Sequence, residues 1–180
     1  SQPFLSAVFT ISSHHPYRVP ETYKGKFRKG KLKIQQTILY SDYALSKFFA
    51  AVSAMPWYKN TLFVITADHS SEADDNFYQT RTGQYSVPII FYTPANETGI
   101  TNKTIAQHTD IMPTILDLLH FPDPFIAFGS SLNRSNENHF SLSYLNNNYE
   151  LIQNGYAWQT DHRVAEALSL FEHDSRLTLN

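Results

Sequence analysis

Asp68 and His69 form the first pair of side chains with recognisable chemistry in this sequence. They follow the apolar run of residues 61–67, which predicts a buried strand. In open α/β sheets ligands bind beyond the carboxyl ends of strands. A carboxylate beside an imidazole suits a divalent metal such as zinc or manganese, provided that the backbone curls enough for both side chains to reach one ion. The alternative is a turn-forming or helix-capping aspartate beside a surface histidine.

A second candidate, His14 with His15, follows another apolar run over residues 4–12. Two histidines at a strand end could bind a metal, a phosphate or a proton, or they could be ordinary loop residues. If the two strands are parallel, both pairs lie at the same edge of the sheet. His108 precedes a predicted helix, where backbone N–H groups could attract an anion. A capping or packing role is its alternative.

The elements that must position these side chains come in the order strand, helix, strand. Apolar residues spaced by three, four or seven positions predict an amphipathic helix over residues 34–55, and Pro56 ends it. A strand–helix–strand order predicts a parallel pair joined by a right-handed crossover. Both flanking strands are nearly all apolar, as expected when helices cover both faces of a sheet. The pattern therefore predicts an α/β fold.

The rest of the chain is predicted as follows: a strand over 85–93, a helix over 110–120, a hairpin turning at Asn154-Gly155, and a short helix over 163–171. Pro88 indicates an edge strand, a bulge or a strand start. The change in residue pattern after residue 140, toward a hairpin, suggests that the chain has two parts. Residues 1–135 form the α/β part, and residues 136–180 form an antiparallel extension.

Composition excludes several classes of protein. The 180 residues are 42% hydrophobic, which is enough for a core and argues against disorder. A formal charge of −2 argues against a dedicated nucleic-acid-binding protein. The absence of Cys excludes disulfides, thiolate metal sites and a cysteine nucleophile. The apolar runs are too short to span a bilayer.

Two basic features could attract anions. Residues 17–33 carry a cluster of lysines and arginines, interpreted as a solvated loop or as a rim beside an anion site. Arg81 could bind a phosphate through two of its guanidinium nitrogens, or tie its loop to a carboxylate such as Glu72 or Asp74. We expect the tie.

Six segments spread over residues 4–132 carry a family resemblance. They are, in chain order, residues 9–17, 40–45, 57–69, 87–92, 107–116 and 127–129. Together they resemble lipoteichoic acid synthase-type phosphoglycerol transferases, which belong to the sulfatase branch of the alkaline phosphatase superfamily. The resemblance implies a parallel-sheet α/β sandwich of the alkaline phosphatase/sulfatase type, with a small antiparallel C-terminal extension.

The resemblance also implies a role for each candidate residue. Asp68 and His69 correspond to two ligands of the catalytic metal. His14 corresponds to the histidine that contacts the phosphoryl oxygens or the leaving group. His15 and His108 are assigned to substrate binding as well. His15 stands where the family usually has an aromatic residue, and His108 where it often has Gln or His, near the site but not on the metal.

The family uses a metal-activated Thr as nucleophile, or a Cys-derived formylglycine in true sulfatases. That residue and an acidic metal ligand precede the histidine segment, whereas this chain begins three residues before the strand of that segment. Thr10 and Thr66 lie inside predicted strands and are poor substitutes. The expectation is a C-terminal fragment without a catalytic nucleophile, inactive alone and completed by an N-terminal half.

The leading functional expectation is part of a metal-dependent phosphoglycerol or phospho-group transferase acting on lipid or glycan substrates of the cell envelope. Manganese is the expected metal, with zinc, calcium and magnesium as alternatives. The expected location is the outer face of a bacterial membrane, with any anchor in upstream helices. The alternatives are a sulfatase, which the identity of the nucleophile would distinguish, and a non-catalytic binding module.

Overall fold

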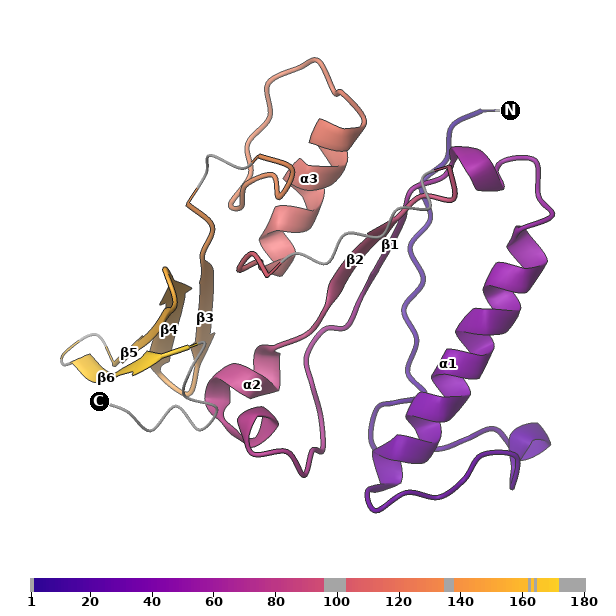
Figure 1. The fold of residues 1–180 in the computed structure, drawn as a ribbon, viewed down its shortest axis with the longest axis horizontal. Helices are drawn as coiled ribbons and strands as arrows, with labels where there is room; N and C mark the ends of the chain where they lie inside the picture. Colours follow the sequence, from indigo (N-terminus) through magenta and orange to yellow (C-terminus); the bar gives the residue numbers. More distant parts are fainter. Residues whose placement is uncertain (1, 96–102, 135–137, 162, 164, 172–180) are drawn as a thin grey trace. The chain divides into compact units, whose positions relative to one another are not determined.

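The computed structural model describes residues 2–95, 103–134, 138–161, 163 and 165–171, and Figure 1 traces their elements. The chain divides into two compact units. The first unit consists of Ser1–Leu62, Ser71–Asp74 and Thr93–Ala95, and the second consists of Phe63–Ser70, Asp75–Tyr92 and Asn96–Asn180. The domain boundary expected after residue 135 stays a prediction.

The first unit is built on one long helix, α1 (Lys33–Val52), which confirms the helix expected from the apolar spacing. Ile34 and Thr37 form its buried face, and the Thr37 hydroxyl donates to the Ile34 carbonyl at 2.8 Å. Two short 3-10 helices accompany it, η1 (Glu21–Tyr23) and η2 (Tyr58–Asn60). Across the described residues, no helix is both long enough and apolar enough to cross a bilayer.

Aromatic packing attaches the lysine- and arginine-rich segment, residues 17–33, to α1. The rings of Tyr23 and Phe27 contact those of Tyr40 and Tyr43, with centroid separations between 5.3 and 5.9 Å. Such ring contacts bury apolar area while the neighbouring lysines stay in water. The segment predicted as a solvated loop therefore has an apolar attachment to the helix.

The segment over residues 2–11, expected as a buried strand, is not a strand. Leu5 and Val8 are 95% and 83% exposed, and the ring of Phe4 contacts that of Trp57 at 5.5 Å. Apolar, β-branched composition favours a strand, but a strand exists only where its backbone groups bond to a neighbour. The prediction of strand structure at residues 4–12 is thus wrong for this structure.

The first sheet of the second unit has two strands, β1 (Phe63–Thr66) and β2 (Ile89–Tyr92). They pair antiparallel, with Phe63 opposite Tyr92 and Thr66 opposite Ile89. The parallel pairing expected between residues 4–12 and 61–67 is therefore wrong, because residues 2–11 form no strand and β1 pairs antiparallel with β2. Pro88 lies immediately before β2, where its missing N–H costs no ladder bond.

Short helices connect these strands to the rest of the unit. The polar stretch between β1 and β2 contains η3 (Phe77–Gln79) and α2 (Arg81–Tyr85). After β2 come η4 (His108–Asp110) and α3 (Ile111–Leu118), which confirm the helix expected over 110–120. Asp110 is only 2% exposed and accepts from the backbone N–H groups of Gln107 and Ser130, both at 2.9 Å.

The C-terminal sheet contains four antiparallel strands in sequence order: β3 (Ser141–Leu145), β4 (Asn148–Gln153), β5 (Tyr156–Thr160) and β6 (Ala165–Leu170). The turn at Asn154-Gly155, with φ of 52° and 80°, confirms the predicted hairpin. The helix expected over 163–171 is wrong, since β6 pairs with β5 there. Burial alternates along β6, as in a strand: Ser169 is buried between exposed Leu168 and Leu170.

A carboxylate near the end of α3 should make stability depend on pH. The Ser131 hydroxyl donates to Asp117 at 2.8 Å, and this bond, with smaller contributions from Asn133 and Arg134, lowers the pKa of Asp117. A lowered folded-state pKa stabilises the protein above the unfolded pKa of about 4, and this stabilisation is lost as the pH falls through the folded value.

Ser131→Ala should therefore lower the thermal unfolding midpoint at neutral pH. The gap from the wild type should close in strong acid. Midpoints measured from neutral pH to below pH ~3 test this. A gap that does not change with pH would contradict the assignment.

Candidate functional site

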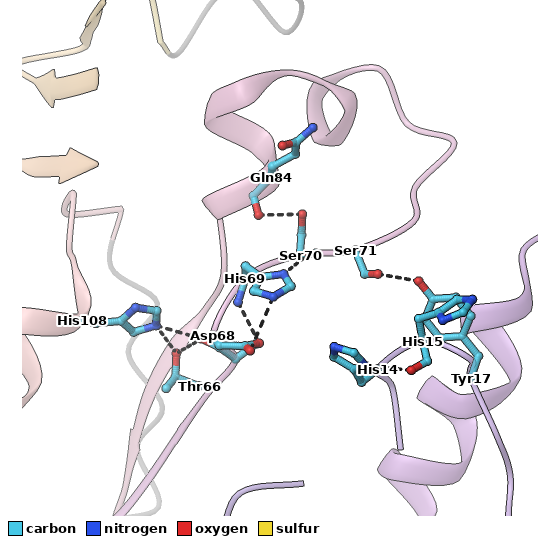
Figure 2. Close-up of polar contacts among 11 residues, drawn as sticks. His14, His15, Tyr17, Thr66, Asp68, His69, Ser70, Ser71, Gln84 and His108 are labelled. Carbon is cyan, nitrogen blue, oxygen red and sulfur yellow. Dashed lines mark hydrogen bonds and ion pairs between the residues drawn. The ribbon is translucent and has the colours of Figure 1, made fainter. Parts of the chain in front are cut away.

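The end of β1 positions Asp68 and His69. The strand stops at Thr66, so both residues lie beyond the ladder, where the backbone can curl. The His69 N–H donates to Asp68 Oδ1 at 2.9 Å, and His69 Nε2 lies 3.5 Å from Asp68 Oδ2. Figure 2 shows the two side chains facing each other. Both are about half exposed, so a ligand can reach them from solvent.

The hydrogen bond at the other ring nitrogen sets the tautomer of His69. Its Nδ1 lies 2.6 Å from the carbonyl oxygen of Ser70. A carbonyl only accepts, so a neutral His69 carries its proton on Nδ1 and leaves a lone pair on Nε2. Metal-binding histidines are commonly held in this way. The free lone pair is the one that faces the Asp68 carboxylate.

The separation of these two donor atoms fits a shared ion. Two ligands each about 2.1 Å from one metal at a tetrahedral angle lie about 3.4 Å apart, close to the observed 3.5 Å. The donor set of one carboxylate and one imidazole is also suitable for a divalent transition metal. Within the described residues, however, no group of three His, Cys, Asp or Glu side chains could hold a metal. At this strand end the chain therefore supplies two donor atoms, Asp68 Oδ2 and His69 Nε2, whose separation fits a shared metal ion.

His108 lies beside the same strand end. Its Nε2 is 2.8 Å from the Ala67 carbonyl oxygen and 3.5 Å from Thr66 Oγ1. Contact with a carbonyl places the proton of a neutral ring on Nε2, so this nitrogen is committed to the backbone. The sequence-predicted residues Asp68, His69 and His108 are therefore all attached to the end of β1 (Figure 2).

Ser70 connects this strand end to α2. Its N–H donates to the carbonyl oxygen of Gln84 at 2.8 Å. Its hydroxyl contacts the same oxygen at 2.9 Å and the Gly83 carbonyl oxygen at 3.2 Å. The residue whose carbonyl orients His69 is thus itself held at two points by one short helix (Figure 2).

His14 and His15 belong to the first unit. Both are exposed; His14 Nδ1 contacts the His15 carbonyl at 2.7 Å, and the His15 ring meets Tyr17 edge-on at 5.7 Å. A neutral His14 therefore carries its proton on Nδ1, and its Nε2 is a hydrogen-bond acceptor. The Tyr17 hydroxyl is 2.8 Å from Ser71 Oγ, which ties this loop to a neighbouring segment of the same unit. Substrate binding by His14 and His15 stays a prediction.

The expected ion pair of Arg81 with Glu72 or Asp74 is wrong. Arg81 Nη2 instead donates to two backbone carbonyls of the C-terminal sheet, those of Leu145 and, at 2.9 Å, Asn148. The turn between β3 and β4 presents these carbonyls, and a guanidinium with fixed donor directions can reach both. Asp74 pairs with Lys31 at 2.9 Å, a hydrogen bond that lowers the pKa of the carboxyl group.

The residues that support the site are not evident from the sequence. Ser70 indicates only a turn after the strand, and Thr82 and Glu150 carry no signal at all. Thr82 Oγ1 donates to Glu150 Oε2 at 2.7 Å, and both residues are only 2% exposed. Residues 68 positions apart along the chain show no periodicity or motif that could link them.

The family of the chain follows from comparison with known proteins. The sequence profile of the sulfatase family matches residues 1–121, about two thirds of the chain, including every residue of the strand end described above. The chain belongs to the sulfatase family. This places it in a family of enzymes and confirms the resemblance found through the ordered motifs.

Curated relatives of this sulfatase-family chain include enzymes of two kinds. Lipoteichoic acid synthase 1 of Bacillus subtilis is 27% identical over 150 residues, which cover 73% of this chain and 23% of the relative. An arylsulfatase of Clostridium perfringens is 28% identical over 117 residues, covering 61% of this chain and 24% of that enzyme. The lipoteichoic acid synthase of Staphylococcus saprophyticus is 29% identical over 135 residues, covering 66% and 21%.

A solved structure supports the fold of the family member. A protein of the alkaline phosphatase superfamily from Vibrio parahaemolyticus superimposes with a TM-score of 0.69 and 22% sequence identity. The match covers 88% of this chain and 39% of that protein. The α/β fold class of the alkaline phosphatase/sulfatase type is thereby confirmed. The chain spans about a quarter of the length of the curated relatives named above.

Proposed function

We propose that this chain forms part of a metal-dependent transferase that moves phosphoglycerol or a related phospho-group between cell-envelope lipids or glycans. The observation that carries the proposal is the Asp68–His69 pair, with its donor atoms 3.5 Å apart and the His69 lone pair directed at the carboxylate. The likeness to two lipoteichoic acid synthases supports the substrate class. The proposal assigns the catalytic nucleophile to a residue outside positions 1–180.

In this proposal Asp68 and His69 hold a divalent metal, with manganese as the first choice and zinc, calcium or magnesium as alternatives. When bound, the metal neutralises charge on the phosphoryl oxygens. In its neutral form His69 offers the Nε2 lone pair to the metal, because its Nδ1–H donates to the Ser70 carbonyl. Asp68 contributes the negative charge that favours a cation over water at this exposed position.

The histidines have separate proposed roles. His108 fixes the backbone of the strand end through the Ala67 carbonyl, and Nδ1 of the neutral ring remains available to accept a hydrogen bond from a hydroxyl group of the substrate. His14 and His15 are assigned to the substrate on the family resemblance. Only the protonated form of His14 carries a proton on Nε2 as well as on Nδ1, and in this form Nε2–H would donate to a phosphoryl oxygen or protonate the departing alcohol.

The proposed location follows from the same relatives. We place the catalytic part on the outer face of a bacterial cell membrane, because lipid-linked phosphoglycerol and envelope glycans are found there. Any membrane attachment would come from segments outside the described helices. The partner of this chain would be the remaining part of the same protein.

A sulfatase is the second candidate, because an arylsulfatase is 28% identical over 61% of this chain. Sulfate esters and phosphodiesters present similar tetrahedral oxyanions, so an Asp-His metal pair suits both. The two differ in the bond that breaks, P–O or S–O, and in the nucleophile. The geometry of the strand end therefore supports the shared chemistry.

One experiment separates the two candidates. The full-length protein, loaded with Mn²⁺, is incubated with phosphatidylglycerol vesicles and, in parallel, with p-nitrophenyl sulfate. Attack of the nucleophile on phosphorus breaks the P–O bond to the lipid, and the released alkoxide takes a proton to become diacylglycerol. We expect diacylglycerol release at least ~100-fold faster than in a chelator-treated sample.

Nitrophenol release from the sulfate ester without diacylglycerol release would favour the sulfatase. Diacylglycerol release that is unchanged by chelator would contradict the metal site. No turnover of either ester by the metal-loaded protein would favour a non-catalytic binding module.

A further inference from the structure

Hydrogen bonds and a short stretch of backbone together join the C-terminal sheet to His69 within the second unit. This path starts at Glu150 of β4, passes through Thr82 and the backbone of α2, and reaches His69 through Ser70. The path thus connects a buried carboxylate of the sheet to the imidazole at the end of β1.

The first link is buried and polar. Glu150 Oε2 accepts from Thr82 Oγ1 at 2.7 Å and from Gln159 Nε2 at 2.6 Å. With Thr82 and Glu150 each 2% exposed, water does not compete for the bond. A buried carboxylate is costly unless it is hydrogen-bonded, so the sheet and the helix fix each other here.

The second link runs through α2 itself. The helix is only five residues long, and its own backbone bonds cannot hold it in place. It is held at Thr82 by Glu150 and at Arg81 by the carbonyls of Leu145 and Asn148. The next residues, 83 and 84, present the two carbonyls that bind Ser70. The position of Ser70 therefore depends on where the sheet holds the helix.

The third link fixes the orientation of the His69 imidazole. The Ser70 carbonyl accepts a hydrogen bond from His69 Nδ1–H at 2.6 Å, while the Ser70 N–H and hydroxyl donate to carbonyls of α2. A shift of α2 moves the Ser70 peptide, and with it the direction of the His69 lone pair. Outer groups that orient a ligand histidine commonly contribute 10–100-fold to metal affinity.

We propose that Thr82 and Glu150 are positioning residues for His69: the C-terminal sheet holds α2 and Ser70 so that His69 Nε2 faces the Asp68 carboxylate. This inference rests on the proposed metal site and extends it to residues that touch neither metal nor substrate. The antiparallel sheet then has a role in metal binding, besides its contribution to stability.

The test compares four variants of the full-length protein by Mn²⁺ titration. Thr82→Val removes the hydroxyl but keeps the shape, and it should weaken Mn²⁺ binding about 5-fold, less than loss of a direct partner of a ligand. Thr82→Ser keeps the hydroxyl and should bind Mn²⁺ like the wild type. Glu150→Met combined with Thr82→Val should weaken Mn²⁺ binding little further, because both changes break the same Thr82–Glu150 bond, and the contact with Gln159 that is also lost lies within the sheet.

The fourth variant, Thr114→Val, is the matched control. Thr114 is also buried, 3% exposed, and its hydroxyl bonds the backbone of Asp110 and Leu132 away from Ser70. It should lower the thermal midpoint about as much as Thr82→Val and leave Mn²⁺ affinity unchanged. Equal losses of affinity in the two variants would overturn the proposal, because stability alone would then explain both.

A readout without metal separates this inference from the proposed function. In ¹⁵N-histidine-labelled protein, the His69 Nδ1 proton should exchange faster with water in Thr82→Val than in the wild type. If Thr82→Val fails to fold, Ser70→Ala carries the same expectation, because it loses the hydroxyl contacts to α2. Unchanged exchange overturns the positioning role, whereas a wild type that binds no Mn²⁺ overturns the proposed metal site.

Discussion

Replacing Asp68 by asparagine should weaken Mn²⁺ binding by more than about 100-fold, since loss of a mere outer partner already costs 10–100-fold. Asparagine keeps an oxygen at the Oδ1 position, which accepts from the His69 N–H at 2.9 Å, and it removes the charge. The turn should therefore persist while the metal ligand is lost. Calorimetric titration of the full-length protein measures the affinity, and diacylglycerol release should fall with it.

This substitution separates the two interpretations that the sequence left open. If Asp68 serves only to form the turn, Asp68→Asn should bind Mn²⁺ like the wild type and Asp68→Ala should lose stability. Glu72→Gln is the matched control, because it removes one exposed carboxylate of the same loop and should leave the affinity within about 2-fold. Loss of binding in this control would point to a general charge effect.

Gly83→Ala should strongly lower the stability of the protein. A Cβ at this position would lie 2.6 Å from the Phe77 carbonyl carbon and 2.7 Å from Tyr78 Cα, and it would also overlap the Phe77 carbonyl oxygen. These atoms are backbone and cannot rotate away, so η3 and α2 would have to separate. Overpacking of this kind costs about 3 kcal/mol, which lowers the thermal midpoint by roughly 6–12 °C.

The control for this variant is Gly25→Ala. Gly25 has a positive φ of 77°, but an added Cβ would meet nothing within 4 Å, so only backbone strain opposes the change. It should cost about 1 kcal/mol. Because Gly83 also presents a carbonyl to Ser70, Gly83→Ala should weaken Mn²⁺ binding as well, and Gly25→Ala should not. Equal midpoints for the two variants would show that the close contact at Gly83 relaxes at little cost.

The local elements were predictable from the sequence. Helix α1 follows from apolar spacing, and the β4–β5 turn follows from Asn154-Gly155, whose positive φ values suit a tight hairpin. The placement of Asp68 and His69 just beyond a strand was also visible, since an apolar run ends there. Each of these depends on residues close together in the chain.

Pairing between distant segments was not predictable in the same way. The apolar run over residues 4–12 has the composition of a strand but no ladder, and β1 pairs antiparallel with β2. The residues expected as a helix over 163–171 became β6, because β5 offered an edge for it to bond. The composition of a segment indicates which secondary structures it could form. Whether it forms a strand depends on a neighbouring backbone to which it can hydrogen-bond.

Short runs of residues were enough to identify the family, several of the elements and the two metal-binding candidates, because each of these signals is local. The folded chain was needed to learn that Arg81 binds backbone carbonyls, that His108 contacts the end of β1, and that a buried Thr82–Glu150 bond holds the helix behind His69. Such contacts join residues from about 40 to 68 positions apart, and their energies depend on burial and direction, which a linear sequence does not contain.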